Sequence, residues 1–421
     1  MKRSLGTILL ALICFALGAA VQRYYDTHRG AGASVAQQTP PSAAAAVDFS
    51  SEPLWAYGFT TVRKPGETAA PQSPPTRDLR PNEDKNEQTR PRTVAGSTAT
   101  YSVVDVRDGS NVIDWFPSDH PLPMPDVIRR GPSGMGRLMR GCGSCHLPNG
   151  QGRPENAPPA ALPLAYFIRQ IHDFRAGLRR SADPRKPNTN TMIDLAKGMT
   201  DDEVEAAATY FAAIAYRPWT RVVEADLVPT TRIVGNLFLP TSEAPTEPIG
   251  GRIIEVPENE EQTELYRNPR VGFVAYVPRG SLDKGKDLVT TGGMRVVGNT
   301  IIQGKTTPCV TCHGLDLMGV ADVPPIAGRS PSYIVRQLWD IQQGTRNGLA
   351  VQLMKMAIVN LTPEHLVSVA AYVSSRPAVR ATTATEARRV EPANGAVSLL
   401  KSPSGVPRGR AVPARRPAIA E

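Results

Sequence analysis

The sequence predicts a mainly α-helical fold in which one helical module occurs twice, the two copies being joined by a short β-rich segment. Three observations predict it. A Cys-x-x-Cys-His motif starts at Cys142 and again at Cys309, 167 residues later. A helical tract repeats at the same offset, and runs of β-branched residues lie between the copies. A chain of 421 residues has room for two or three such domains.

The helical tract carries the clearest signs of duplication. AYFIRQIHDFRAGLR, residues 165–179, matches SYIVRQLWDIQQGTR, residues 332–346. Six residues repeat: Tyr166, Arg169, Gln170, Asp173, Gly177 and Arg179 reappear as Tyr333, Arg336, Gln337, Asp340, Gly344 and Arg346. Further on, MTDDEVEAAATYFAAI (199–214) matches LTPEHLVSVAAYVSSR (361–376) at an offset of 162. A fixed period of this kind indicates one structural unit used twice.

Local signals mark where the helices of each module begin. Thr200 and Glu203 have the spacing of a capping box, and in the second copy Thr362 is followed by Pro363, a residue favoured at the first helical position. Ser281 is the predicted cap of a helix that precedes the second motif. We therefore expect a first module over residues 99–221 and a second over 278–378.

Between the modules, residues 222–277 have a different pattern. TRVVEA, TRIVGNLFL, GRIIEV and GFVAYV are short β-branched runs separated by Pro, Gly and acidic residues, which predicts strands. The pattern leaves open whether the strands form a small sheet of their own or clasp the two modules together.

Both ends of the chain predict segments outside the modules. Lys2 and Arg3 precede an apolar run over residues 5–21, so residues 1–21 are expected to be a signal peptide or a membrane anchor, with the rest of the chain in the periplasm. Residues 22–98 read as a low-complexity tether, and residues 379–421 read as a basic disordered tail. Within the tether, Trp55, Tyr57 and Phe59 form an aromatic cluster that is expected to pack locally, the alternative being that it docks onto a domain or a partner.

The cysteines predict the chemistry. Of five, Cys14 lies in the export segment and the other four form the two motifs. Two thiols on one helical turn can add to the vinyl groups of haem, and the adjacent His can ligate the iron. Zinc would need both motifs to meet, a redox dithiol leaves the His unexplained, and disulfides are the remaining alternative. The residues predicted to hold two covalently attached haem c groups are Cys142, Cys145 and His146, and Cys309, Cys312 and His313.

With the repeated helix and the final capped helix, these motifs resemble the class I c-type cytochromes, and among them the tandem di-haem cytochromes of the bacterial periplasm. The resemblance covers the two modules. It implies a Met thioether opposite each His. The repeat alignment pairs Met192 with Met354, so the implied iron ligands are His146 with Met192 and His313 with Met354, with Met356 in reserve.

Iron that is held by His and Met has no open position, so the sequence favours an electron carrier over an enzyme. The alternatives are a di-haem peroxidase or sulfur-compound oxidase, or the cytochrome subunit of a periplasmic dehydrogenase. Expected partners are redox proteins: a dehydrogenase or respiratory complex and a terminal oxidase. The formal charge of +9 is concentrated in the tail and does not indicate nucleic-acid binding. The tail is expected to contact anionic lipid or an acidic redox partner, or else to serve only solubility.

Two further expectations concern groups near the haems. Pro158 and Pro325 each lie twelve residues after the predicted ligand His, and a backbone carbonyl near them is expected to accept the imidazole N–H. The twin arginines Arg179 and Arg346 are expected to pair with haem propionates or with Asp side chains, or else to act as plain helix-end charges.

Overall fold

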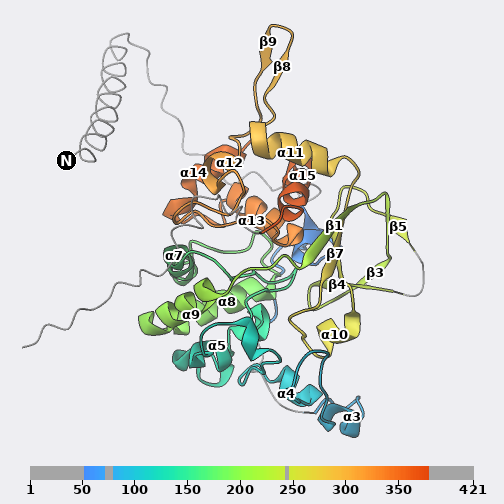
Figure 1. Ribbon diagram of the computed structural model, residues 1–421, viewed down its shortest axis with the longest axis vertical. Helices are drawn as coiled ribbons and strands as arrows, with labels where there is room; N and C mark the ends of the chain where they lie inside the picture. The colour runs from blue at the N-terminus through green and yellow to red at the C-terminus, as the bar shows by residue number, and fades with distance from the viewer. Residues whose placement is uncertain (1–51, 72–78, 242–245, 379–421) are drawn as a thin grey trace, which may run out of the picture. The chain divides into compact units, whose positions relative to one another are not determined.

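The computed structural model describes residues 52–71, 79–241 and 246–378. The predicted signal peptide or anchor, residues 1–21, and the predicted tail, residues 379–421, lie outside the described residues. The described residues between 53 and 378 belong to one compact unit. Figure 1 shows the helices of the first module next to those of the second, with strands at their side.

The first module is helical, and its helices are short up to the first motif. They are α4 (Val103–Arg107), η2 (Pro117–Asp119), α5 (Asp126–Arg129), η3 (Ser133–Leu138), α6 (Gly143–His146), α7 (Leu164–Arg175), α8 (Pro187–Gly198) and α9 (Asp201–Ala213). The predicted capping box of Thr200 and Glu203 is confirmed at the start of α9. Ile171 and Phe174 of α7 belong to the same buried core cluster as Phe211 of α9. These contacts hold the two long helices together.

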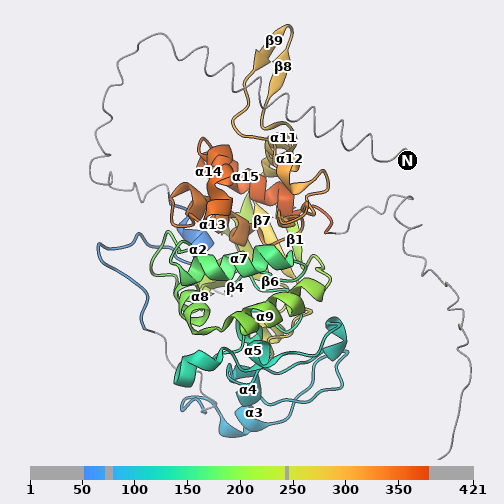
Figure 2. The same cartoon turned by 90° about the vertical axis from the view of Figure 1, so that its left-hand side faces the viewer.

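The second module repeats this plan with one addition. Its elements are α11 (Ser281–Thr291), β8 (Arg295–Val297), β9 (Thr300–Ile302), α12 (Val310–His313), α13 (Pro331–Gln342), η4 (Leu349–Val351), α14 (Gln352–Ile358) and α15 (Pro363–Ser374). The β8–β9 hairpin projects away from α11 (Figure 2). Thr362 caps α15 as predicted, in a capping box with His365. The predicted Ser281 cap is wrong: α11 starts at Ser281 itself, after Gly280 at φ 78°, a left-handed conformation that glycine adopts without strain.

No single helix among the described residues is long and apolar enough to cross a membrane. The pair 349–358 and 363–374 passes that test only when taken together, by length and composition, and it is bent by 111°.

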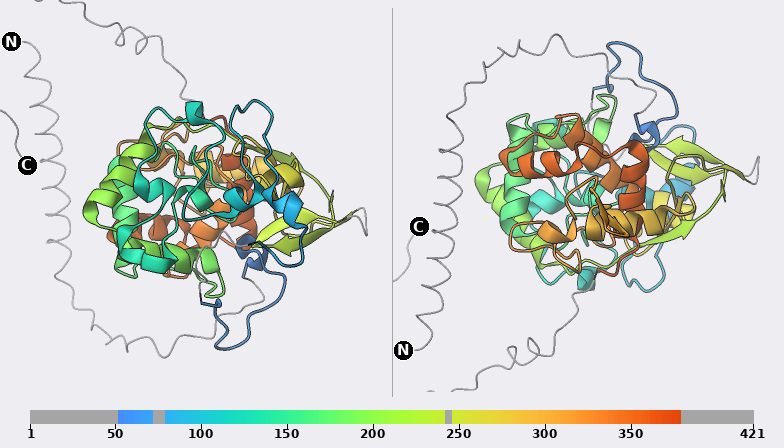
Figure 3. Two further views of the ribbon diagram at one scale, coloured as in Figure 1. Left: turned by 90° about the horizontal axis from the view of Figure 1, so that it is seen from below. Right: turned by 90° about the horizontal axis from the view of Figure 1, so that it is seen from above.

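The strands predicted between the modules are confirmed. They are β1 (Thr220–Glu224), β2 (Leu227–Val228), β3 (Thr231–Val234), β4 (Leu237–Pro240), β5 (Glu247–Pro248), β6 (Ile254–Pro257) and β7 (Phe273–Val277), with α10 (Glu260–Glu264) before the last. A three-stranded sheet has the order β1-β7-β6, with β1 parallel and β6 antiparallel to β7. β2 pairs with β5 and β3 with β4. The mainly α prediction is therefore confirmed in part, because a sheet accompanies the helices (Figure 3).

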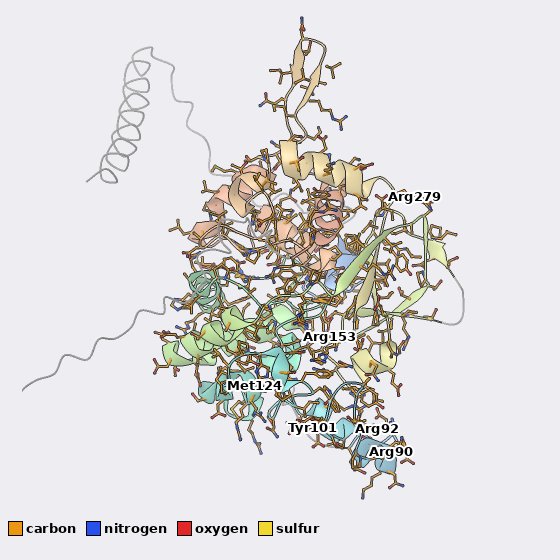
Figure 4. All side chains as sticks on the ribbon, in the orientation of Figure 1. Arg90, Arg92, Tyr101, Met124, Arg153 and Arg279 are labelled. Atoms are coloured by element: carbon orange, nitrogen blue, oxygen red, sulfur yellow. The ribbon has the colours of Figure 1, made fainter. Side chains whose placement is uncertain are left out.

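The β-rich insert is a sheet of its own and a clasp at the same time. Towards the second module, Glu255 of β6 accepts a hydrogen bond of 2.8 Å from the hydroxyl of Ser330, which caps α13. Towards the first module, Arg267 donates to the carbonyl of Ser144 in α6. Arg153 of the first module also forms an ion pair with Glu264 of α10. Figure 4 labels Arg153 where the first module meets α10. The insert therefore touches both modules.

The predicted tether over residues 22–98 needs correction where the structure describes it. α2 (Leu54–Tyr57) and α3 (Lys85–Thr89) lie in this segment. Tyr57 is fully buried, and its hydroxyl donates a 2.7 Å hydrogen bond to Asp340 of α13. Trp55 and Phe59 pack against the core of the second module. The aromatic cluster therefore docks onto the second module rather than packing only locally, because contact with the core removes these apolar rings from water.

Candidate functional site

The first Cys-x-x-Cys-His motif forms a single helical turn at the wall of a cavity. Cys142 precedes α6, and Cys145 and His146 lie within it. All three line a cavity of about 260 Å³, together with Met192 of α8. Arg140, Asn156, Asn188 and Asn236 supply polar groups to the same wall. The fold thus brings the first motif and the predicted Met ligand, 46 residues apart from His146 in sequence, to one cavity.

The imidazole of His146 is held in one tautomer. Its Nδ1 lies 2.7 Å from the carbonyl oxygen of Ala157. Because a carbonyl oxygen only accepts hydrogen bonds, Nδ1 carries the proton and Nε2 keeps its lone pair. Burial lowers the pKa of His146, and the charge of Arg179 lowers it further. The ring is therefore neutral near pH 7, the form in which histidine binds a metal.

The second motif repeats this arrangement. Cys309 precedes α12, and His313 is buried at its end. His313 Nδ1 lies 2.9 Å from the carbonyl oxygen of Pro324, and burial lowers the pKa of His313. Ala157 and Pro324 are 167 residues apart, so the two acceptors are equivalent in the repeat. The sequence predicts an acceptor carbonyl near Pro158 and near Pro325. The structure places each acceptor one residue before that proline.

The second predicted Met ligand differs from its reserve in burial. Met354 of α14 is half-buried and packs against the core of the second module. The side chain of Met356, by contrast, is 67% exposed. A 2.6 Å hydrogen bond from the hydroxyl of Thr306 to the carbonyl of Ala357 ties the segment before Cys309 to α14. This bond holds α14 close to the second motif.

The four thiols suit covalent attachment better than the zinc or redox alternatives. Burial raises the pKa of Cys142 to about 12 and that of Cys309 to about 11. Zinc sites and catalytic dithiols need thiolates, which these environments disfavour. None of the four motif cysteines is paired in a disulfide, which argues against the disulfide alternative. Within the described ranges, no three His, Cys, Asp or Glu side chains are grouped as a metal site would need.

The side chains present fit a covalent haem at each motif. Each has two thiols on one turn, an adjacent neutral imidazole with a free Nε2 lone pair, and a half-buried thioether in the same module. In the second module, the apolar side chains of Leu315, Leu349 and Leu353 are exposed, which leaves apolar surface available to an apolar group.

The structure shows which protein groups bind the side chains of the twin arginines. Arg179 donates to the side-chain oxygens of Gln170, at 3.0 Å, and Gln337, at 2.9 Å. Arg346 donates to the same two oxygens, at 2.9 and 3.1 Å, and also to the hydroxyl of Tyr166. Their hydrogen bonds therefore go to Gln and Tyr rather than to Asp. The residues repeated in sequence meet reciprocally at the boundary between the modules.

One wall residue of the first site comes from the β-rich insert and is missed by sequence reasoning. Asn236 follows Gly235 in the tight turn between β3 and β4 and has φ 69°. Gly-Asn between two β-branched runs is a recognisable hairpin signal. That signal cannot tell which part of the molecule the turn touches, and the structure shows that Asn236 reaches the cavity of the first motif.

Two such motifs, each on its own helical module, define a c-type cytochrome. No model of a known protein family matches the chain. It is 33% identical over 75 residues to cytochrome c-554(548) of Halomonas halodenitrificans, a match that covers 18% of this chain and 90% of that protein. The chain belongs to the class I c-type cytochromes; it is a di-haem member and carries two covalently bound haem c groups.

Two further proteins are similar over longer stretches. The chain is 23% identical over 239 residues to the thiosulfate dehydrogenase electron acceptor of Thiomonas intermedia, which covers 56% of this chain and 78% of that protein. Among solved structures, cytochrome c4 of Acidithiobacillus ferrooxidans aligns with a TM-score of 0.34 and 21% identity, over 56% of this chain and 98% of that chain.

Proposed function

We propose that this cytochrome is an electron carrier in which His146 and Met192 ligate the first haem iron and His313 and Met354 the second. One observation carries the proposal: His146 and Met192 line the same cavity, and His146 keeps its Nε2 lone pair because Nδ1 is bonded to Ala157. When bound, each haem accepts and releases one electron. With a histidine and a methionine both bound to it, the iron would have no position left for a substrate, and the thioether would favour the ferrous state.

The visible spectrum of the full chain, oxidised and reduced, with and without carbon monoxide, tests this proposal. We expect two low-spin haems per chain and no spectral change with carbon monoxide, since both axial positions are filled by protein ligands. A shift at one haem would reveal an open iron and would favour the di-haem peroxidase or oxidase instead.

The electron donor is proposed to be a dehydrogenase of sulfur compounds. The support is the name of the Thiomonas relative, an electron acceptor of thiosulfate dehydrogenase. We expect the oxidised chain to be reduced when thiosulfate and a thiosulfate dehydrogenase are both added, as followed by the rise of ferrous haem absorbance. Thiosulfate without the dehydrogenase is the control, and reduction in that control would mean that the chain oxidises thiosulfate itself.

The proposed location is the periplasm, with residues 1–21 acting as a signal peptide or as an anchor. The support is the apolar run that follows Lys2 and Arg3. Haem staining of periplasmic, membrane and cytoplasmic fractions tests the location, and haem-bearing chain found only in the cytoplasm would contradict it.

A further inference from the structure

The two loops that orient the ligand histidines are both bound by one side chain. His146 donates to the carbonyl of Ala157, and His313 donates to the carbonyl of Pro324. The next residues along the chain are Pro158 and Pro325. A side chain that bonds to the carbonyls of both prolines therefore lies next to both carbonyls that accept the histidine N–H groups.

Arg329, at the end of the second loop, is that group. Its Nε donates to the carbonyl of Pro325 at 2.8 Å, and its Nη1 donates to the carbonyl of Pro158. Nη2 adds a 3.0 Å hydrogen bond to the carbonyl of Ala160. Three donors of one planar group therefore hold the first loop on both sides of Pro159 and the second loop directly after Pro324. Such a fork of fixed geometry is specific to Arg.

The guanidinium is itself held in place. Arg329 is 3% exposed, and its guanidinium carbon lies 4.4 Å from the centre of the Tyr216 ring. The Tyr216 hydroxyl donates to the carbonyl of Gly328 at 2.9 Å, and the Ser374 hydroxyl donates to the carbonyl of Arg329 itself. The contact with the Tyr216 ring and the hydrogen bonds to the neighbouring backbone therefore hold the Arg329 side chain in place within the protein itself.

Two features indicate a role beyond packing. Within the described ranges Arg329 has no carboxylate within ion-pair distance, and a buried charge without such a partner costs folding free energy. Its equivalent in the first module, 167 residues earlier, is Leu162. The module therefore does not need an arginine at this position, and the residue serves the tandem arrangement.

We propose that Arg329 is a positioning residue that couples the two haem sites. It fixes both loops that accept the histidine N–H bonds, and it places one positive charge beside both. The inference rests on the proposed ligation by His146 and His313. A positive charge stabilises the less positive ferrous state, so Arg329 raises both reduction potentials.

Arg336 provides a matched control. It is also buried, and its guanidinium also binds carbonyls: Pro154, at 2.8 Å, and Ala56, at 2.6 Å. Among the described residues, its guanidinium bonds to the first histidine loop and makes no hydrogen bond to the second. Its removal therefore deletes a buried guanidinium that ties down one histidine loop only.

The experiment is a redox titration of full-length Arg329→Gln, Arg329→Lys and Arg336→Gln, each with both haems attached, together with proton NMR of the histidine Nδ1–H signals. For Arg329→Gln we expect the ratio of reduced to oxidised haem at a fixed potential to fall about tenfold at both haems, the order that Coulomb's law gives for loss of one charge about 10 Å away at an effective dielectric of 20. Both Nδ1–H signals move. Arg336→Gln moves the first Nδ1–H signal alone.

Arg329→Lys separates charge from geometry, because it keeps the charge and loses the fork. We expect it to restore most of both potentials while both Nδ1–H signals still move. The proposal is overturned if Arg329→Gln changes one haem or neither, or, where that variant does not fold, if Arg329→Lys leaves both Nδ1–H signals in place. A wild-type spectrum without two low-spin haems would instead refute the proposed ligation, so the two failures are distinguishable.

Discussion

Replacing Cys142 and Cys145 together by alanine leaves one covalent haem on the chain instead of two, and replacing Cys309 and Cys312 has the same effect at the other module. The thiols are the predicted points of attachment, and no other cysteine lies in either motif. Haem absorbance per chain falls by about half, and mass spectrometry of the denatured protein shows the loss of one haem.

Cys14→Ala is the control for this experiment. Cys14 lies outside both motifs, so the variant is expected to keep both haems. Two haems retained after denaturation of the Cys142/Cys145 double variant would refute attachment at the first motif. The matching result for the second pair would refute attachment there.

Replacing Met192 by alanine opens the first haem iron while the haem stays attached. Carbon monoxide then binds one of the two ferrous haems, because the thioether no longer fills the position opposite His146. The reduction potential of that haem falls by about 0.1–0.3 V, a fraction of the roughly 0.8 V range over which axial ligands set haem potentials. Carbon monoxide difference spectra and a redox titration measure the two effects.

Other methionines supply the controls for Met192→Ala. Met199 is buried in the core of the first module, so Met199→Ala should lower stability without opening an iron. In the second module, Met354→Ala should bind carbon monoxide and Met356→Ala should not, since Met356 is largely exposed. If Met356→Ala alone opened the second haem, the assignment of Met354 would be wrong.

Much of the fold follows from local sequence patterns. Between the modules, short runs of β-branched residues are separated by turn residues, which marks the strands. Helices α9 and α15 begin at capping boxes. These signals act over a few residues, so they can be read without a structure. Prediction was weaker where a few side chains matter more than composition. Tyr57 is fully buried in a segment that reads as a tether.

The candidate site divides in the same way. The two motifs and the offset that pairs Met192 with Met354 are visible in the sequence, because covalent attachment and duplication both leave fixed spacings. The contacts of Asn236 and of the twin arginines cannot be read from the sequence. Asn236 reaches the first cavity from another segment, and Arg179 and Arg346 meet each other's glutamines.

The sequence by itself thus determined the class of protein, and it predicted the attachment residues and the repeat. Only the tertiary structure decided which carbonyls accept the histidine protons, and that Arg329 bonds beside both of them. The physical reason is that a motif is local in the chain, whereas a backbone carbonyl has no residue-specific signature. Its hydrogen-bond partner depends on how two modules and an insert pack together.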